Sequence, residues 1–165
     1  MSDVLDGFAQ KARDHARVPM QWDSSSNAGF TTGSPWMRVN EDYETWNAAA
    51  ELQDSSSVLA FYKSALKFRK DNPIFTYGEF RDISNDHPQV FGYIRALGDT
   101  KAIVLLNFKE TPVVFDIGGV DRWNDYKLAL ANYEDVKGEI GPESMKLQAA
   151  GVVLRGYEGR VYLNK

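Results

Sequence analysis

The chain has 165 residues, of which 43% are hydrophobic and 25% charged, so a domain with a core is expected and disorder is not. Its net charge is −4 and its Lys and Arg are spread singly, which excludes the basic surface that nucleic acids require. No cysteine is present and His15 and His87 lie far apart, so no metal-ligand pattern exists and no cofactor is expected. No apolar run or signal peptide points to a membrane, and we expect a cytoplasmic protein.

The first segment, residues 1–53, is rich in turn-forming residues and lacks a regular hydrophobic period. So long an irregular run is uncommon in a compact domain and is usually functional or packed on something larger. Short helices are predicted only around residues 4–10 and 47–53.

One long helix is predicted over residues 55–71, capped by Asp54 or Ser55 and stopped before Pro73. Its apolar residues recur at helical spacing, and their breadth favours burial on more than one side. They are Val58, Leu59, Phe61, Tyr62, Ala65, Leu66 and Phe68. A single helix and a long loop cannot close a core of their own, so this part needs a partner surface.

After Pro73 the hydrophobic period becomes two, and turn signals separate the runs, which predicts an antiparallel sandwich or barrel. The run AIVLLNF is apolar throughout and predicts a central strand that is buried on both faces. The predicted strands are residues 74–83, 89–96, 101–108, 113–117, 126–131, 144–148, 151–155 and 160–163.

The strongest candidate site is RDHAR at residues 13–17. The guanidinium groups of Arg13 and Arg17 suit a carboxylate, a phosphate or the vicinal hydroxyls of a sugar. The alternative is that both arginines pair with nearby acids and hold the loop, which is the commoner role of such residues.

Other residue groups offer weaker candidates. Trp22, Trp36 and Trp46 could form a stacking platform for sugar rings, although tryptophan more often anchors a core or a loop. A hydrolase's carboxylate pair could come from the acids of two turn regions, which are usually solvated. These acids are Glu41, Asp42, Glu44, Asp82 and Asp86. His87 is read as a turn residue rather than a base.

The stretch RDHARVPMQWD, followed by NAGFTTGSPWMRVN, resembles the α-glucosidases, oligo-1,6-glucosidases and maltases of the α-amylase superfamily of glycoside hydrolases. Further on, SVLAFYKSALKFRKDNPIFTYGEF resembles that family's last barrel helix and the entry to its C-terminal domain. LRGYEGRVYL resembles its closing strands. The resemblance covers roughly residues 8–165.

The resemblance implies a mainly β chain, with an antiparallel β-sandwich of the α-amylase C-terminal type after a long loop and one α-helix from the end of a (β/α)8 barrel. Residues 1–72 would be the barrel remnant and residues 73–165 the β-domain. In the family, the catalytic Asp, Glu and second Asp precede the Arg-Asp-x-x-Arg stretch, so none is expected here. Arg13 corresponds to the arginine that fixes glucose in the −1 subsite, and Arg17 to its companion.

We therefore expect the C-terminal fragment of a retaining α-glucosidase, acting on maltose- or isomaltose-type sugars, that is inactive alone and binds sugars only within the full enzyme. The rival hypothesis is a stand-alone carbohydrate-binding or protein-interaction β-module. The chain could also associate with itself through the helix face that a barrel would have covered.

Overall fold

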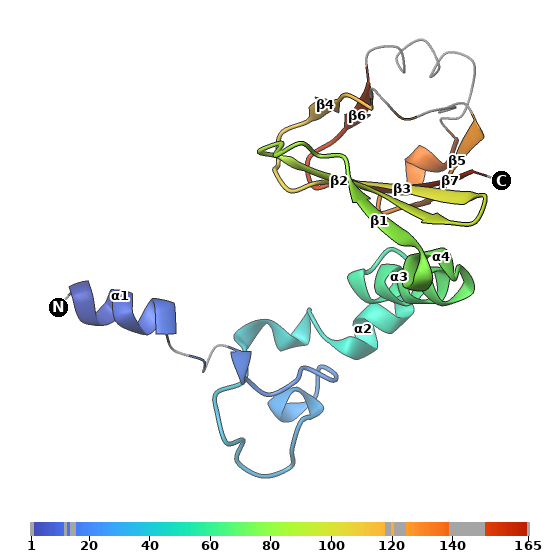
Figure 1. Cartoon of the computed structure of the whole chain (residues 1–165). Coiled ribbons are helices and arrows are strands. Elements are labelled where there is room, and N and C mark those ends of the chain that lie inside the picture. Colours follow the sequence, from blue (N-terminus) through green and yellow to red (C-terminus); the bar gives the residue numbers. More distant parts are fainter. Residues whose placement is uncertain are drawn as a thin grey trace. The chain divides into compact units, whose positions relative to one another are not determined.

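The computed structural model describes residues 2–11, 13, 16–117, 120, 125–138 and 151–164 (Figure 1). The chain divides into two compact units, Met1–Ser64 and Ala65–Lys165, with the division inside one helix. Each unit is described by itself. No helix among the described residues combines the length and apolar character that a membrane span requires.

The first unit consists of short helices joined by loops. Its elements are α1 (Ser2–Lys11), the 3-10 turns η2 (Ser26–Gly29) and η3 (Glu41–Glu44), α2 (Ala48–Gln53) and the start of α3 (Val58–Asp71). Helices were predicted around residues 4–10 and 47–53, and both are present. The side chain of Asn47 caps α2, because its Oδ1 accepts the N–H of Ala50 at 2.9 Å.

Helix α3 begins three residues later than predicted. Asp54 stabilises a turn rather than the helix, since its Oδ1 accepts the backbone N–H of Ser56 at 2.8 Å and its hydroxyl at 2.7 Å. At the other end, the Asn72 amide donates to the carbonyl of Phe68 at 2.7 Å. None of the residues of α3 is buried, so the prediction of burial on more than one side is wrong for this structure.

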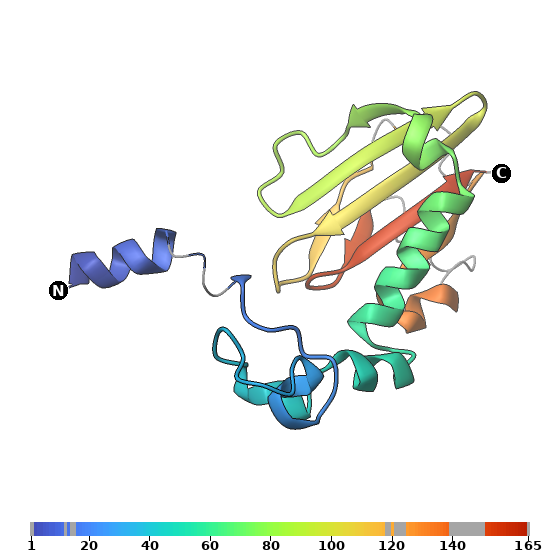
Figure 2. The same cartoon turned by 90° about the horizontal axis from the view of Figure 1, so that it is seen from below.

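The second unit is built on an antiparallel sheet of five strands in the order β1-β2-β3-β7-β5, with a separate pair β4-β6 (Figure 2). The strands are β1 (Glu79–Asp82), β2 (Val90–Leu97), β3 (Thr100–Asn107), β4 (Val113–Phe115), β5 (Tyr126–Ala131), β6 (Val152–Leu154) and β7 (Gly159–Asn164). A 3-10 turn, η5 (Glu134–Gly138), follows β5. The prediction of antiparallel β-structure is confirmed, whereas the strand predicted over residues 144–148 lies outside the described residues.

The prediction of a strand over residues 74–83 is wrong for its first half. Residues Ile74–Tyr77 form the short helix α4, and only β1 is extended. Pro73 precedes α4 with φ −55° and ψ −23°, which starts a helical turn. Ile74 and Phe75 are then both buried, a result that alternation along a strand would not give.

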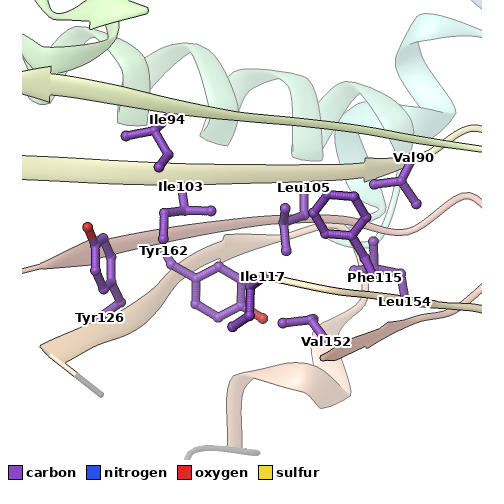
Figure 3. Packing of buried hydrophobic residues seen from close by; sticks show 10 residues of the cluster. All are labelled: Val90, Ile94, Ile103, Leu105, Phe115, Ile117, Tyr126, Val152, Leu154 and Tyr162. Carbon is purple, nitrogen blue, oxygen red and sulfur yellow. The ribbon is translucent and has the colours of Figure 1, made fainter. Parts of the chain in front are cut away.

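Two apolar clusters cover the two faces of the large sheet. In the first, side chains from β2, β3 and β7 meet Phe115, Val152 and Leu154 of the β4-β6 side (Figure 3). In the second, Ile74 and Phe75 of α4 pack on Ala102 and Val104 of β3, with α4 and the β4-β6 pair on opposite sides of the sheet (Figure 1). Strand β3 therefore contributes to both clusters, which confirms its prediction as a central strand.

Candidate functional site

Arg13 and Arg17 lie on an exposed segment of the first unit. The backbone N–H of Ala16 donates to the carbonyl of Arg13 at 3.1 Å. Among the residues that the structure describes, neither guanidinium forms an ion pair or a side-chain hydrogen bond. Within the described residues, no ion pair to a nearby acid therefore holds the loop through either arginine.

Gln21 joins the segment that follows these arginines to the region before α2. Its amide nitrogen donates to Asp42 Oδ1 at 3.1 Å and to the carbonyl of Trp46 at 2.6 Å, and its Oε1 accepts from Asn40 at 3.1 Å. Its own carbonyl accepts the N–H of Ala48 at 3.0 Å. The sequence reasoning did not identify Gln21 as a structural residue, because its partners lie about twenty residues away and leave no local pattern.

The loop after Trp22 has an unusual backbone. Asn27, Ala28 and Gly29 have φ of 56°, 59° and 66°, in the left-handed region that Asn and Gly tolerate better than Ala. Ala28 is fully buried, and its carbonyl accepts the N–H of Trp22 at 2.9 Å. Gly29 suits its φ of +66°, and a Cβ there would lie 2.6 Å from Asp23 Oδ2, so a larger residue would also have to displace the Asp23 side chain.

Asp23 stabilises this loop by accepting hydrogen bonds. Its Oδ1 accepts the N–H of Ser25 at 2.8 Å and also the Ser25 hydroxyl. These hydrogen bonds lower the pKa of Asp23 below its ordinary value. The Asn27 amide completes the loop by donating to the carbonyls of Thr31 and Gly33, at 3.2 and 3.0 Å. The loop is thus held by its own polar groups.

The three tryptophans of the first unit are exposed to solvent. Trp22, Trp36 and Trp46 keep 53%, 63% and 64% of their surface accessible, so none serves as a core anchor in this unit. The backbones of Trp22 and Trp46 are joined through their neighbours, because Gln21 binds the carbonyl of Trp46 and Ala49 donates to that of Trp22.

Three of the acids considered as a hydrolytic pair, Glu41, Asp42 and Asp82, make ion pairs or hydrogen bonds with other residues. Glu41 pairs with Arg38, three residues away, and Asp42 accepts from Gln21. Asp82 accepts the N–H of Ser84 at 2.6 Å as well as its hydroxyl, which lowers the pKa of the carboxyl. No group of three or more His, Asp or Glu side chains that could hold a metal ion occurs in the described part of the chain.

His87 serves the turn between β1 and β2. Its Nδ1 accepts the backbone N–H of Gln89 at 3.2 Å and of Val90 at 3.0 Å, and its ring meets Phe115 edge-on at 5.7 Å. A nitrogen that accepts two backbone donors is occupied, which agrees with the interpretation of His87 as a turn residue.

The densest charged cluster of the second unit surrounds Glu158, which is only 1% exposed. Its Oε2 accepts the N–H of Arg155 at 2.6 Å, and its Oε1 accepts from Arg160 Nε at 2.9 Å. Arg155 also makes two 2.9 Å hydrogen bonds to Asp135. Sequence reasoning missed this Glu158 cluster; the charges in LRGYEGR are its only local signal.

The carboxylates of this cluster are hydrogen-bonded to its arginines. Burial by itself would raise the pKa of Glu158, but hydrogen bonds from Arg160 and the Arg155 backbone, with the charges of both arginines, lower it overall. The pKa of Asp135 is lowered chiefly by its hydrogen bonds from Arg155. In the described residues no buried side-chain polar atom lacks a hydrogen-bond partner, as a cluster that stabilises the fold requires.

Comparison with known proteins identifies a family that this chain resembles. The family "Alpha amylase, catalytic domain" matches residues 1–78, which include both arginines and the Gln21 segment. The oligo-1,6-glucosidase of Parageobacillus thermoglucosidasius is 38% identical over 160 residues, which is 97% of this chain and 27% of that enzyme. The α-glucosidase of Schizosaccharomyces pombe is 40% identical over 135 residues, which is 80% of this chain and 23% of that enzyme.

The similarity extends from the sequence to the three-dimensional structure. The crystal structure of the trehalose-6-phosphate hydrolase of Bacillus licheniformis superimposes with a TM-score of 0.81 at 33% identity, covering 94% of this chain and 27% of that one. The chain is therefore a relative of the α-amylase superfamily of glycoside hydrolases. Its relatives in that superfamily include oligo-1,6-glucosidases and an α-glucosidase, the groups that the sequence was expected to resemble, and it spans about 27% of the length of the oligo-1,6-glucosidase it matches.

Proposed function

We propose that the chain is the C-terminal part of a retaining α-glucosidase that removes terminal glucose from maltose- or isomaltose-type oligosaccharides. The observation that carries this proposal is the 38% identity over 97% of the chain to an oligo-1,6-glucosidase of which it spans 27%. In this proposal residues 1–72 supply the loop after the last barrel strand and the last barrel helix. Residues 73–165 form the C-terminal β-domain, with the β4-β6 pair and the five-stranded sheet as its two layers.

Catalysis by retention needs two carboxyl groups about 5–5.5 Å apart across the scissile bond. The acids of the first unit that the sequence suggested are exposed, and two of them are held by Arg38 and Gln21. These contacts support the proposal that the chain contributes neither the nucleophile nor the acid/base of the reaction. Its contribution would be Arg13, whose open guanidinium fixes the glucose at the cleavage site, with Arg17 beside it.

An assay of the purified chain with p-nitrophenyl α-glucoside tests this proposal, with a full-length oligo-1,6-glucosidase as the positive control. We expect no turnover above the buffer blank. Turnover by the chain alone that survives Arg13→Ala would contradict both the predicted inactivity and the role of Arg13.

The exposure of Trp22, Trp36 and Trp46 favours one second candidate, a module that binds carbohydrate on its own. Calorimetric titration with maltose and isomaltose separates the two functions. Saturable heat that disappears in Trp22→Ala would support the module, and the absence of heat for both sugars would remove it.

A further inference from the structure

Strand β1 is an edge of the five-stranded sheet in the second unit. Among the described strands its neighbour is β2 alone, and all four of its residues are exposed (Figure 2). The backbone groups on its other side can hydrogen-bond a further strand, so an edge of this kind is a template for pairing with another chain. The residues of β1 determine which strand fits it.

The pairing of β1 with β2 fixes which backbone groups of β1 point outward. The N–H of Ile83 donates to the carbonyl of Gly92 at 2.9 Å, in the same register as the β1–β2 pairs. Hydrogen-bonded and non-hydrogen-bonded pairs alternate along an antiparallel ladder, so every second residue of β1 turns its N–H and C=O away from β2. These residues are Phe80 and Asp82. Their backbone groups are the donors and acceptors that a further strand would meet.

The charged side chains of β1 are complementary to those of a second, antiparallel β1. Glu79 and Arg81 point to the same face of the sheet, because they are two residues apart on a strand. Both are exposed, and neither makes an ion pair within the described part of the chain. When two copies of β1 pair with Phe80 opposite Phe80, each Glu79 lies opposite the Arg81 of the other copy. Two equivalent ion pairs then form about one two-fold axis, as in an isologous interface.

The register centred on Phe80 agrees with both the backbone and the charges. A Phe80–Phe80 pair exchanges two outward hydrogen bonds, which puts the Glu79–Arg81 pairs at non-hydrogen-bonded positions, where side chains approach most closely. Asp82 comes to lie opposite Gly78, which has extended backbone and no side chain to clash. Registers centred on Glu79, Arg81 or Asp82 would instead place two like charges opposite each other, and such pairs are destabilising.

An aromatic row adds an apolar contact at the centre of this pairing. Phe80 is 54% exposed, and its ring centroid lies 5.3 Å from that of Tyr93, which in turn lies 5.3 Å from that of Phe91. The row therefore reaches the free edge of the sheet with Phe80. In the Phe80–Phe80 register the rows of two copies meet, and aromatic pairs across neighbouring strands stabilise a sheet.

We propose that β1 is an interface for a second copy of this chain, with the two β1 strands antiparallel and Phe80 opposite Phe80. The two five-stranded sheets then form one continuous sheet. This contact goes beyond the proposed function, because it uses none of the residues that the proposal assigns to the sugar. Strands of four residues bury little surface, so the dimer is weak and forms at high concentration.

Sedimentation velocity of the full chain tests the dimer at concentrations from about 10 μM to about 1 mM, the range in which small interfaces associate. We expect the sedimentation coefficient to rise with concentration. Arg81→Glu and Glu79→Arg should each raise the dissociation constant at least about tenfold, because like charges then lie opposite each other. The double variant Glu79→Arg/Arg81→Glu restores opposite charges and should dimerise like the unmodified chain. An equimolar mixture of the two single variants should also dimerise, for the same reason.

Lys127→Glu is the control with the same change of charge, since Lys127 is exposed on β5, at the opposite edge of the sheet. It should leave the dissociation constant unchanged, and circular dichroism checks that each variant is folded. Amide hydrogen exchange of the unmodified chain, followed by NMR, locates the contact without any substitution. The amides of Phe80 and Asp82 should become protected as the concentration rises, whereas that of Arg81, already bonded to β2, should not change.

Three results would overturn the proposal. The first is a chain that stays monomeric at every concentration. The second is a dimer that the two single variants weaken no more than Lys127→Glu does, or that Leu66→Asp dissociates while Arg81→Glu does not, because the contact would then lie elsewhere. The third is a dimer in which the amide of Phe80 gains no protection.

Discussion

The guanidinium of Arg155 lies over the ring of Tyr133, with its central carbon 3.9 Å from the ring centroid. The hydroxyl of Tyr133 in turn donates to the carbonyl of Gly156 at 2.9 Å, so the same ring holds both the side chain and the backbone of the turn between β6 and β7. This stacking orients Arg155 toward Asp135 and Glu158, and it joins the end of β5 to that turn. The Glu158 cluster thereby joins the segment after β5 to the turn between β6 and β7.

Replacing Glu158 by Gln should lower the free energy of unfolding by about 3 kcal/mol, because the buried carboxylate that accepts from Arg160 Nε at 2.9 Å would lose its charge. Urea unfolding followed by circular dichroism measures this change. Glu79→Gln, at an exposed position of the edge strand β1, serves as the control and should change stability by less than about 0.5 kcal/mol. Equal values for the two variants would contradict a structural role for Glu158.

The same cluster predicts how stability depends on pH. The pKa of Glu158 is lower in the folded chain than its ordinary value of 4.5, so the folded state favours the charged carboxylate. Its stabilising contribution is complete above about pH 5 and is lost as the pH falls through the folded pKa. Unfolding free energies measured between pH 7 and pH 3 should fall on acidification, with a shallower slope in Glu158→Gln. Identical slopes would show that other carboxylates account for the effect.

Gly156 should not tolerate a side chain. A Cβ at this position would lie 1.9 Å from the carbonyl oxygen of Glu110, which is backbone and cannot rotate away. Gly156→Ala should therefore cost about 3 kcal/mol or more. Gly98→Ala is the informative comparison, because Gly98 has φ +58° but open space around it, so only the conformational cost of about 1 kcal/mol applies. Chemical denaturation of both variants would test this order, and a reversal would contradict the close approach.

The sequence predicted those parts of the fold that depend on local periodicity. Strand β5 has the bounds 126–131 that alternation predicted, and the apolar run of β3 was placed correctly at the centre of the sheet. Alternation failed at residues 74–77, where a helical turn buries two consecutive apolar residues after Pro73. Strand patterns contain no information about such a turn, because both conformations accept Ile and Phe.

The candidate site was predictable only in part, for a different reason. Arg13 and Arg17 were proposed because they lie in a short motif, and they stay a prediction, whereas Gln21 and Glu158 depend on partners that the fold brings together. Gln21 reaches Trp46 across twenty-five residues, and Arg155 reaches Asp135 across twenty. The exposed face of α3 was mispredicted as buried. An amphipathic pattern indicates which side of a helix is apolar, but it does not indicate whether the same chain supplies a surface that covers this side.

Arg13 should matter to activity and not to stability. Its side chain is exposed and makes no ion pair within the described residues, so Arg13→Ala should change the free energy of unfolding by less than about 0.5 kcal/mol. In a full-length enzyme that contains this chain as its C-terminal part, the same substitution should lower kcat/KM for the chromogenic glucoside about a hundredfold, because the sugar loses a positioning contact. Arg38→Ala provides the control, since Arg38 is an exposed arginine of the same unit that already pairs with Glu41. Steady-state kinetics of the unmodified enzyme and the two variants tests this role: if Arg13→Ala and Arg38→Ala both retain the kcat/KM of the unmodified enzyme, Arg13 does not contact the substrate.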